Sequence, residues 1–245
     1  MADGLDKKYK EMTETPVRKL VWRLAIPSII SMAVTSIYNL VDAIYIGKLS
    51  TEATAGIGIS FAYMTIIQAV GFFFGHGSGN HISRALGSKQ REDASQIAAV
   101  GFFSPMIIGL IMAVFGTIYI TPLSIALGAT PDVVPYSNDY MRYIILATPF
   151  MMSALTLNNQ LRLQGNARFG MIGIVSGALL NIILDPLFIF TFRMGVTGAS
   201  LATAISQFVS WCLLLWGTKR KESVHILWKN FKPTWQCYNE IFRGG

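Results

Sequence analysis

The sequence "GALLNIILDPLFIF", residues 177–190, is apolar except for the amide of Asn181 and the carboxylate of Asp185. The two polar residues are four positions apart, so they share one face of a helix. Pro186 follows directly, and its ring removes the N–H that would otherwise bond to the carbonyl of Ile182. The stretch therefore predicts an apolar helix that gathers three oxygen-bearing groups at one place.

The whole chain has the composition of a membrane protein. Of its 245 residues, 52% are hydrophobic and 13% are charged, whereas soluble domains carry about 25% charged residues. A membrane-crossing helix needs about 20 mostly apolar residues. Six segments meet this requirement: 20–46, 54–80, 95–120, 140–161, 169–190 and 196–216. Six such segments argue against a soluble all-α protein and predict an all-α membrane protein, a six-transmembrane-helix bundle.

The positive charges predict how this bundle is oriented. Counting the polar stretches 83–93 and 162–168 as loops, 17 of the 20 Lys and Arg residues fall on the side of the N-terminus. Only Lys48, Arg142 and Arg193 remain for the other side. Because cytoplasmic segments carry an excess of Lys and Arg, both termini are expected in the cytoplasm, N-in/C-in. The net charge of +7 is then explained by orientation in the membrane, and no nucleic-acid partner is implied.

The chain divides into three parts on this basis. Residues 1–19 form a cytoplasmic N-terminal arm, residues 20–217 the six-helix transmembrane lobe, and residues 218–245 a cytoplasmic tail. The tail mixes basic residues with aromatic ones such as Trp228 and Phe231, a pattern typical of an amphipathic segment on a membrane surface. It is interpreted as a linker toward something that is absent from this sequence.

Two of the 13 acidic residues, Asp42 and Asp185, fall within the apolar segments. A carboxylate at the centre of a membrane helix costs about 2.5 to 3.5 kcal/mol, so such residues are candidates for function. The alternative is a hydrogen-bonded carboxylate that only stabilises the bundle. Tyr38 lies one helical turn before Asp42, and Asn39 lies beside it, so this helix also groups polar side chains.

Carboxylate, amide and carbonyl oxygens together suit a hard cation such as Na⁺, or a proton. Asp42, Asn181 and Asp185 therefore form a possible Na⁺ site, and no other metal is expected. Thr203, in "GVTGASLATAISQ" (195–207), can add a hydroxyl, although the small residues around it also suit helix packing alone. Pro27 frees the carbonyl of Arg23 and can allow the first helix to bend.

Other polar residues do not indicate chemistry. Asn158, Asn159 and Gln160 are interpreted as interfacial. The two histidines of "GHGSGNH" (75–81) have no acidic or cysteine partners at ligand spacing, so they are interpreted as non-metal. The sequence shows no nucleophile–base pair, phosphate loop or zinc motif, which disfavours an enzyme and implies no cofactor.

Five stretches together resemble a known family. They are "LAIPSIISMAVTSIYNLVDAIYIGKL", "SRALGSKQ", "LRLQGNAR", "GALLNIILDPLFIF" and "GVTGASLATAISQ". In this order they resemble the amino-terminal lobe of a multidrug and toxic compound extrusion (MATE) transporter. The resemblance implies one lobe of a two-lobe MATE-type fold, which performs secondary active multidrug efflux by antiport of Na⁺ or H⁺.

The resemblance also assigns roles to residues. Asp42, Asn181, Asp185 and Thr203 match the cation or proton site of the amino lobe. Pro27 matches a proline associated with bending of the first helix, and Tyr140 resembles a polar position near the site. The implied partners are membrane lipids, small amphipathic or cationic drugs, and a missing C-terminal lobe or a second copy of the chain. The implied location is the cell membrane.

Two alternatives from outside this reading stay open. A flippase for lipid-linked saccharides has a related architecture, but it would need cationic residues in its lumen to meet a pyrophosphate. A membrane scaffold or interaction half without transport activity would bind neither ion nor drug.

Overall fold

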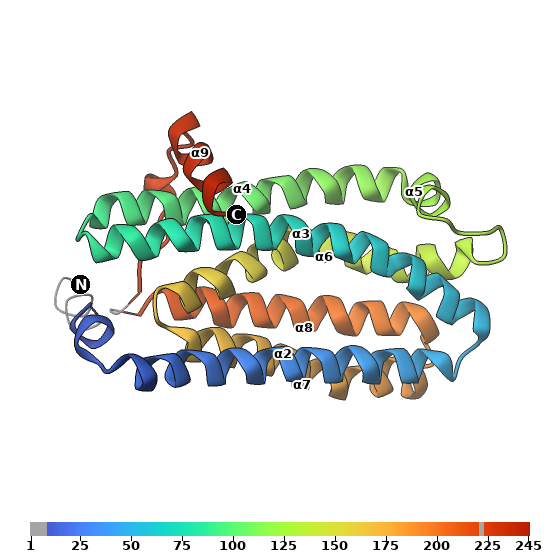
Figure 1. Ribbon diagram of the computed structural model, residues 1–245. Coiled ribbons are helices and arrows are strands. Elements are labelled where there is room, and N and C mark those ends of the chain that lie inside the picture. The colour runs from blue at the N-terminus through green and yellow to red at the C-terminus, as the bar shows by residue number, and fades with distance from the viewer. Residues whose placement is uncertain (1–8, 221–222) are drawn as a thin grey trace.

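The protein, seen here as a computed structural model, is all-helical over the residues that the structure describes, 9–220 and 223–245 (Figure 1). Residues 1–8 of the predicted N-terminal arm and residues 221–222 of the predicted linker lie outside these ranges. The long helices are α2 (Val17–Gly47), α3 (Thr51–Gly87), α4 (Arg91–Ile118), α6 (Val134–Leu163), α7 (Ala167–Pro186) and α8 (Gly195–Thr218). The short elements are α5 (Ile120–Ala126), η1 (Leu187–Thr191), η2 (Trp228–Asn230) and α9 (Trp235–Gly244).

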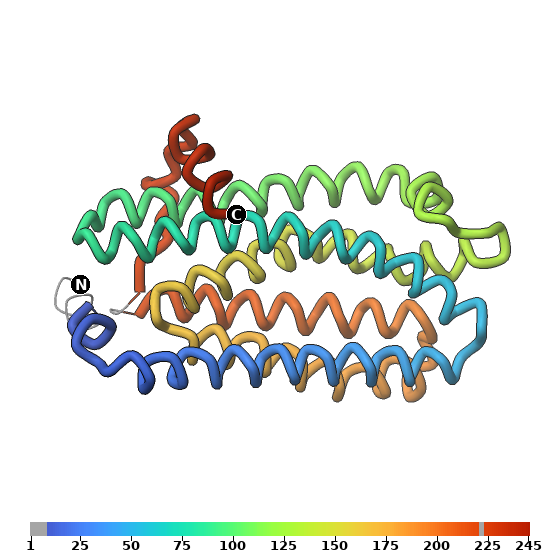
Figure 2. The backbone as a smooth tube through the Cα atoms, in the orientation of Figure 1, coloured from blue at the N-terminus to red at the C-terminus, as the bar shows by residue number. Residues whose placement is uncertain are grey.

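The six long helices run side by side between two ends of the molecule, as the tube trace shows (Figure 2). We call the end where α2 begins and α8 ends the base, and the opposite end, which carries α5, the far end. Within the described residues, six helices, one of them α7 continued by η1, are long and apolar enough to cross a membrane. The predicted fold class, a six-helix membrane bundle, is therefore confirmed.

The turns at the base are shorter than the sequence indicated. The stretch 83–93 was predicted as a loop, which is wrong, because α3 continues to Gly87 and α4 begins at Arg91. Polar residues can extend a membrane helix beyond the apolar core, so polarity alone does not end it. The chain reverses only at Lys89, with a φ of 61°. At the next base turn Gly165 has a φ of 82°, a conformation that glycine adopts without strain.

Helix α6 is the centre of the bundle. It packs against α3, α4 and α8. Of its most apolar 18-residue stretch, 72% is buried inside the bundle. Tyr140, Ile144 and Met152 on this helix are 0–1% exposed. A helix that is surrounded by neighbours on most of its faces forms the core of the bundle, although α6 also buries polar side chains such as Thr148 and Gln160.

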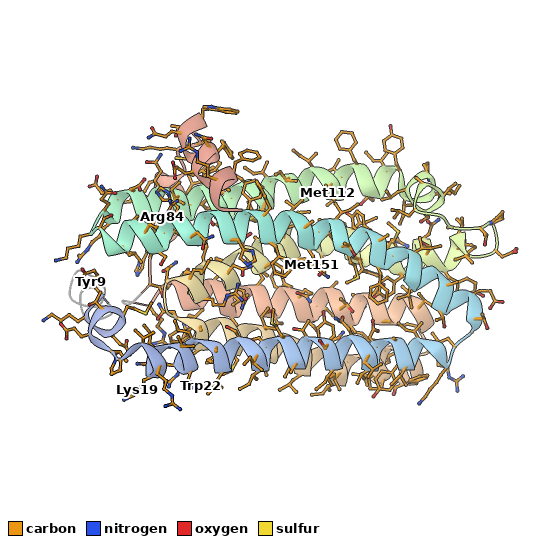
Figure 3. All side chains as sticks on the ribbon, in the orientation of Figure 1. Tyr9, Lys19, Trp22, Arg84, Met112 and Met151 are labelled. Carbon is orange, nitrogen blue, oxygen red and sulfur yellow. The ribbon has the colours of Figure 1, made fainter. Side chains whose placement is uncertain are left out.

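Helix α2 is the most peripheral of the six. It packs mainly on α7, and only 6% of its most apolar 18-residue stretch is buried inside the bundle. Lys19 and Trp22 project away from the bundle near its base, whereas Met151 of α6 lies inside (Figure 3). The buried residues of α2 are Pro27, Ser31, Asp42 and Ile46. One narrow face of this helix therefore makes nearly all of its internal contacts.

The tail folds back onto α3 and α4 rather than continuing away from the bundle. Ile241 of α9 is buried against Gly77, where a Cβ atom would lie 2.2 Å from the Ile241 carbonyl oxygen. His81 lies between two carboxylates, with Nε2 2.6 Å from Asp93 and Nδ1 3.2 Å from Glu240. Sequence spacing missed these partners because Asp93 lies 12 positions and Glu240 lies 159 positions from His81 along the chain. The placement of α9 on a membrane surface stays a prediction.

Close helix contacts depend on glycines at defined positions, and Gly109 gives a direct test. A Cβ atom there would lie 2.6 Å from the Cα atom of Pro149, in the backbone of α6. Overpacking of this kind costs about 1 to 3 kcal/mol. We expect Gly109→Ala to lower the free energy of unfolding by about this amount, measured by thermal or denaturant unfolding in detergent.

Gly58 is the matched control, because it is exposed and a Cβ atom there meets nothing within 4 Å. Gly58→Ala should leave stability unchanged or raise it by up to about 1 kcal/mol, since alanine favours a helix over glycine. Equal effects of the two substitutions would contradict the packing of α4 on α6.

Candidate functional site

Four helices bring the predicted polar residues together in the half of the bundle nearer the far end. Asp42 comes from α2, Asn181 and Asp185 from α7, and Thr203 from α8. The central helix α6 adds Tyr140. We call these five residues the acid cluster. Each is buried, with Asp185 fully inaccessible and Asp42 4% exposed.

Hydrogen bonds connect the members of the acid cluster. The amide nitrogen of Asn181 donates to Oδ1 of Asp185 at 3.1 Å and lies 3.3 Å from the hydroxyl of Thr203. The hydroxyl of Tyr140 donates to Oδ2 of Asp42 at 3.3 Å. The predicted i,i+4 contact on α7 is therefore present, and the cluster joins helices that are distant in sequence.

Three acceptor oxygens of the cluster have no hydrogen-bond partner among the described residues. They are Oδ1 of Asp42, Oδ1 of Asn181 and Oδ2 of Asp185. A buried polar atom without a partner costs about 1 to 3 kcal/mol, so such atoms indicate a place suited to a hydrogen-bond donor or a cation. Oxygen atoms only accept hydrogen bonds or coordinate cations unless a carboxyl is protonated. The cluster is therefore suited chemically to a small cation or a proton.

Two further polar residues of α2 adjoin the cluster. Tyr38 lies near Asp42, Asp185 and Gln207 of α8. Asn39 lines the pocket described below. Gln207 was missed by the sequence prediction, although it lies four residues after Thr203, on the same face of the helix.

The two prolines occupy different places. Pro186 lies at the end of α7 and is followed by η1, one turn of π-helix. Pro27 is buried in α2, and Ser31 donates a hydrogen bond to its carbonyl at 2.9 Å. It lies about 20 Å along the helix from Asp42, so it is not part of the acid cluster. The loss of the backbone hydrogen bonds to the carbonyls of Arg23 and Ile182 stays a prediction.

A pocket of about 560 Å³ extends from the cluster toward the base, between α2, α3, α6, α7 and α8. Asn181 and Thr203 line one end, and Arg162 of α6 lines the other. Between them lie neutral polar side chains and flexible apolar ones, including Met64 and Met151. Among the described residues that line the pocket, Arg162 is the one charged side chain.

The amide side chains of α6 differ from their predicted role. Asn159 and Gln160 were interpreted as interfacial, which is wrong, because each is 1% exposed. The amide nitrogen of Gln160 donates to the Ser78 hydroxyl at 2.9 Å and to the Ala98 carbonyl at 3.2 Å. These polar residues lie near the end of an apolar segment, and the sequence could not show that α3 and α4 cover them.

Comparison with known proteins identifies relatives of the chain. The family model MatE matches residues 27–187. The multidrug export protein MepA of Staphylococcus haemolyticus is 29% identical over 242 residues, which cover 98% of this chain and 54% of the relative. The chain therefore spans about half the length of this relative.

Solved structures agree with the sequence comparison. A MATE crystal structure in the straight conformation is 30% identical, with a TM-score of 0.85 over 93% of this chain and 51% of that one. A MATE crystal structure in the bent conformation is 29% identical, with a TM-score of 0.83 over 98% of this chain and 53% of that one. The similarity again extends over about half of each longer chain.

The hydrogen bond between Tyr140 and Asp42 can be tested through stability. Tyr140→Phe removes the single partner that the described residues give to the Asp42 carboxylate. We expect the free energy of unfolding to fall by about 1 to 3 kcal/mol, since a buried acceptor is left without a partner. The measurement is thermal or denaturant unfolding of the purified chain at neutral pH.

Tyr63→Phe is the matched control, because Tyr63 is also buried and its hydroxyl lies 3.1 Å from that of Thr148. Thr148 keeps its own hydrogen bond to the Ile144 carbonyl, so the loss should be about 0.5 to 1.5 kcal/mol. If Tyr140→Phe proves no more destabilising in protein that contains Asp42 than in the Asp42→Ala variant, which has no acceptor at position 42, the proposed contact is absent.

Proposed function

Because the chain belongs to the MatE family, whose members are transporters and not enzymes, we propose that it forms the amino-terminal lobe of a multidrug efflux transporter. The observation that supports this most is the buried acid cluster, with three acceptor oxygens that lack partners. A second lobe, or a second copy of the chain, would provide the opposing wall of the translocation pathway. The base would face the cytoplasm, and the protein would reside in the cell membrane among its lipids.

The proposed driving force is antiport of Na⁺ or H⁺ through the acid cluster. Na⁺ would use the free oxygens of Asp42, Asn181 and Asp185 as ligands. A proton would instead turn one carboxylate into a hydrogen-bond donor, which could satisfy a neighbouring acceptor. Both events reduce buried negative charge, and both fit the residues present.

Coupling follows from where the two acids lie. Asp42 is on the peripheral helix α2, whereas Asp185 is on α7, to which α2 packs most closely. A cation shared between them would hold α2 against α7, and its release would leave two carboxylates that repel each other. An ion that stabilises one helix arrangement more than another shifts the population between them. Substrate release would be linked to that shift.

The proposed substrates are small amphipathic compounds, often cationic. The pocket beside the acid cluster combines methionines with neutral polar groups, and methionine side chains adapt to ligands of different shape. A flippase for pyrophosphate-linked saccharides is less well supported, since one cation among the described lining residues offers little to a pyrophosphate.

Replacement of the acids tests the ion coupling. In vesicles that contain the complete transporter, we expect Asp42→Asn and Asp185→Asn each to slow the efflux of a fluorescent cation about tenfold or more. The reason is that loss of a charge-assisted interaction is worth a factor of ten to a hundred. Efflux would be driven by a Na⁺ gradient and by a pH gradient in separate experiments to identify the ion.

Asp132→Asn serves as the control, because Asp132 is an exposed acid near the far end, outside the pocket and the acid cluster. Its efflux rate should equal that of the unaltered protein. Unchanged efflux in both acid-cluster variants would refute the proposed ion site. As a second readout, Na⁺ should raise the unfolding temperature of the purified chain relative to choline at equal ionic strength, and Asp42→Asn should abolish this rise.

Bending of α2 at Pro27 is a separate part of the proposal. Pro27→Ala restores a backbone N–H and favours a straight helix, since proline in a helix interior costs about 3 kcal/mol. We expect efflux to slow several-fold while the ion-dependent rise in unfolding temperature is kept. Pro105→Ala in α4 is the control and should transport normally, because Pro105 does not line the pocket. Equal transport by the two variants would exclude bending at Pro27 as a step.

A further inference from the structure

The base end of the pocket holds a positively charged side chain in a fixed position. Arg162 lies in the last turn of α6, and its Nη2 donates to Oδ1 of Asn159 at 2.6 Å. The same Nη2 lies 3.2 Å from Nε2 of His76 on α3. Two neighbours on different helices therefore orient one guanidinium group.

Both neighbours are themselves fixed by backbone carbonyls. Nδ1 of His76 lies 2.9 Å from the carbonyl of Phe72, which can only accept, so Nδ1 carries the hydrogen. Nε2 of the neutral ring is then free to accept from Arg162. The amide nitrogen of Asn159 donates to the Leu155 carbonyl at 2.9 Å, which leaves its oxygen for Arg162. The directions of all four hydrogen bonds are consistent with one another.

The guanidinium group keeps unused donors. An arginine has five N–H groups, and the two on Nη2 are used by Asn159 and His76. No described residue accepts from Nη1 or Nε, and no described carboxylate pairs with Arg162.

We propose that Arg162 is the recognition site for the anionic oxygen group, a carboxylate or phosphate, of an amphipathic ligand in the pocket. Planar guanidinium groups bind these anions through paired hydrogen bonds. The apolar part of the ligand lies against Met64, Met151 and Phe72, which line the same pocket. This proposal deepens the proposed function, because it names a ligand class for the pocket of the transporter.

The anion subsite is separate from the acid cluster. Asn181 lies about 20 Å along α7 from the base turn that follows Arg162, at 1.5 Å per residue. A drug-sized ligand held at Arg162 therefore leaves the acid cluster free for the coupling ion. Compounds that carry both charges are accommodated when their anionic group points to the base.

Two dyes of the same ring system test the proposal. Rhodamine 110 has a free carboxylate, and rhodamine 123 is its methyl ester. Their binding to the purified chain in maltoside detergent is measured by fluorescence anisotropy. We expect Arg162→Gln to weaken the binding of rhodamine 110 about ten- to hundredfold and to leave rhodamine 123 within about twofold. Arg162→Lys should recover part of the loss, since it keeps the charge without the planar fork.

Arg168→Gln is the matched control, because Arg168 is exposed near the same base turn and does not line the pocket. It should leave both dyes unaffected, and thermal unfolding confirms that each variant is folded. Equal losses for the two dyes, no loss for rhodamine 110, or no binding of rhodamine 110 to the unaltered chain would overturn the proposal. The efflux test of Asp42 and Asp185 is independent, so either result can fail without the other.

The natural anion can come from a lipid headgroup or from a soluble compound. Phosphatidylglycerol is therefore added to the detergent sample, with phosphatidylcholine as its zwitterionic counterpart. Displacement of rhodamine 110 by phosphatidylglycerol from the unaltered chain, but not by phosphatidylcholine, assigns the subsite to an anionic headgroup. Arg162-dependent binding that neither lipid displaces assigns it to a soluble amphipathic anion.

Discussion

The contact between α2 and α7 around Asp42 and Asp185 is the constraint on which the internal arrangement of this bundle depends. Hydrocarbon provides no hydrogen-bond partners, so each buried carboxylate must find them inside the protein. Asn181 supplies one donor to Asp185, and Tyr140 supplies one to Asp42. The first bond lies within α7, whereas the second joins the central helix α6 to the peripheral helix α2, so these two helices are fixed relative to each other by a polar contact as well as by packing.

The local features of this arrangement could be predicted from the sequence. All six membrane helices were predicted from the lengths of the apolar segments, because each helix that crosses lipid needs its own long apolar segment. The spacing of Asn181 and Asp185 predicted their hydrogen bond, because a helix fixes which residues share a face. Both predictions need only the geometry of a single helix. The ends of α3 were predicted less well, since polar residues beyond the apolar core can continue a helix.

Features that depend on contacts between helices could not be obtained in this way. The burial of Asn159 and the position of Glu240 beside His81 follow from how α3, α6 and the tail pack together. Gln207 faces Tyr38 only because α2 lies against that side of α8. No pattern within one segment carries this information. The resemblance to MATE transporters pointed to Tyr140, which periodicity alone did not single out.

The distribution of charge along the pocket separates two tasks within one lobe. The acid cluster joins α2 to α7 and α8, which is where a change of helix position can respond to an ion. Arg162 is held by α3 and by α6, the most buried helix, so its position is independent of α2. Neutral side chains line the space between them, which avoids a fixed ion pair that would neutralise both ends. Under the proposed function, a ligand anchored at Arg162 and an ion bound at the acid cluster would affect each other through the arrangement of α2, as coupling by conformational change requires.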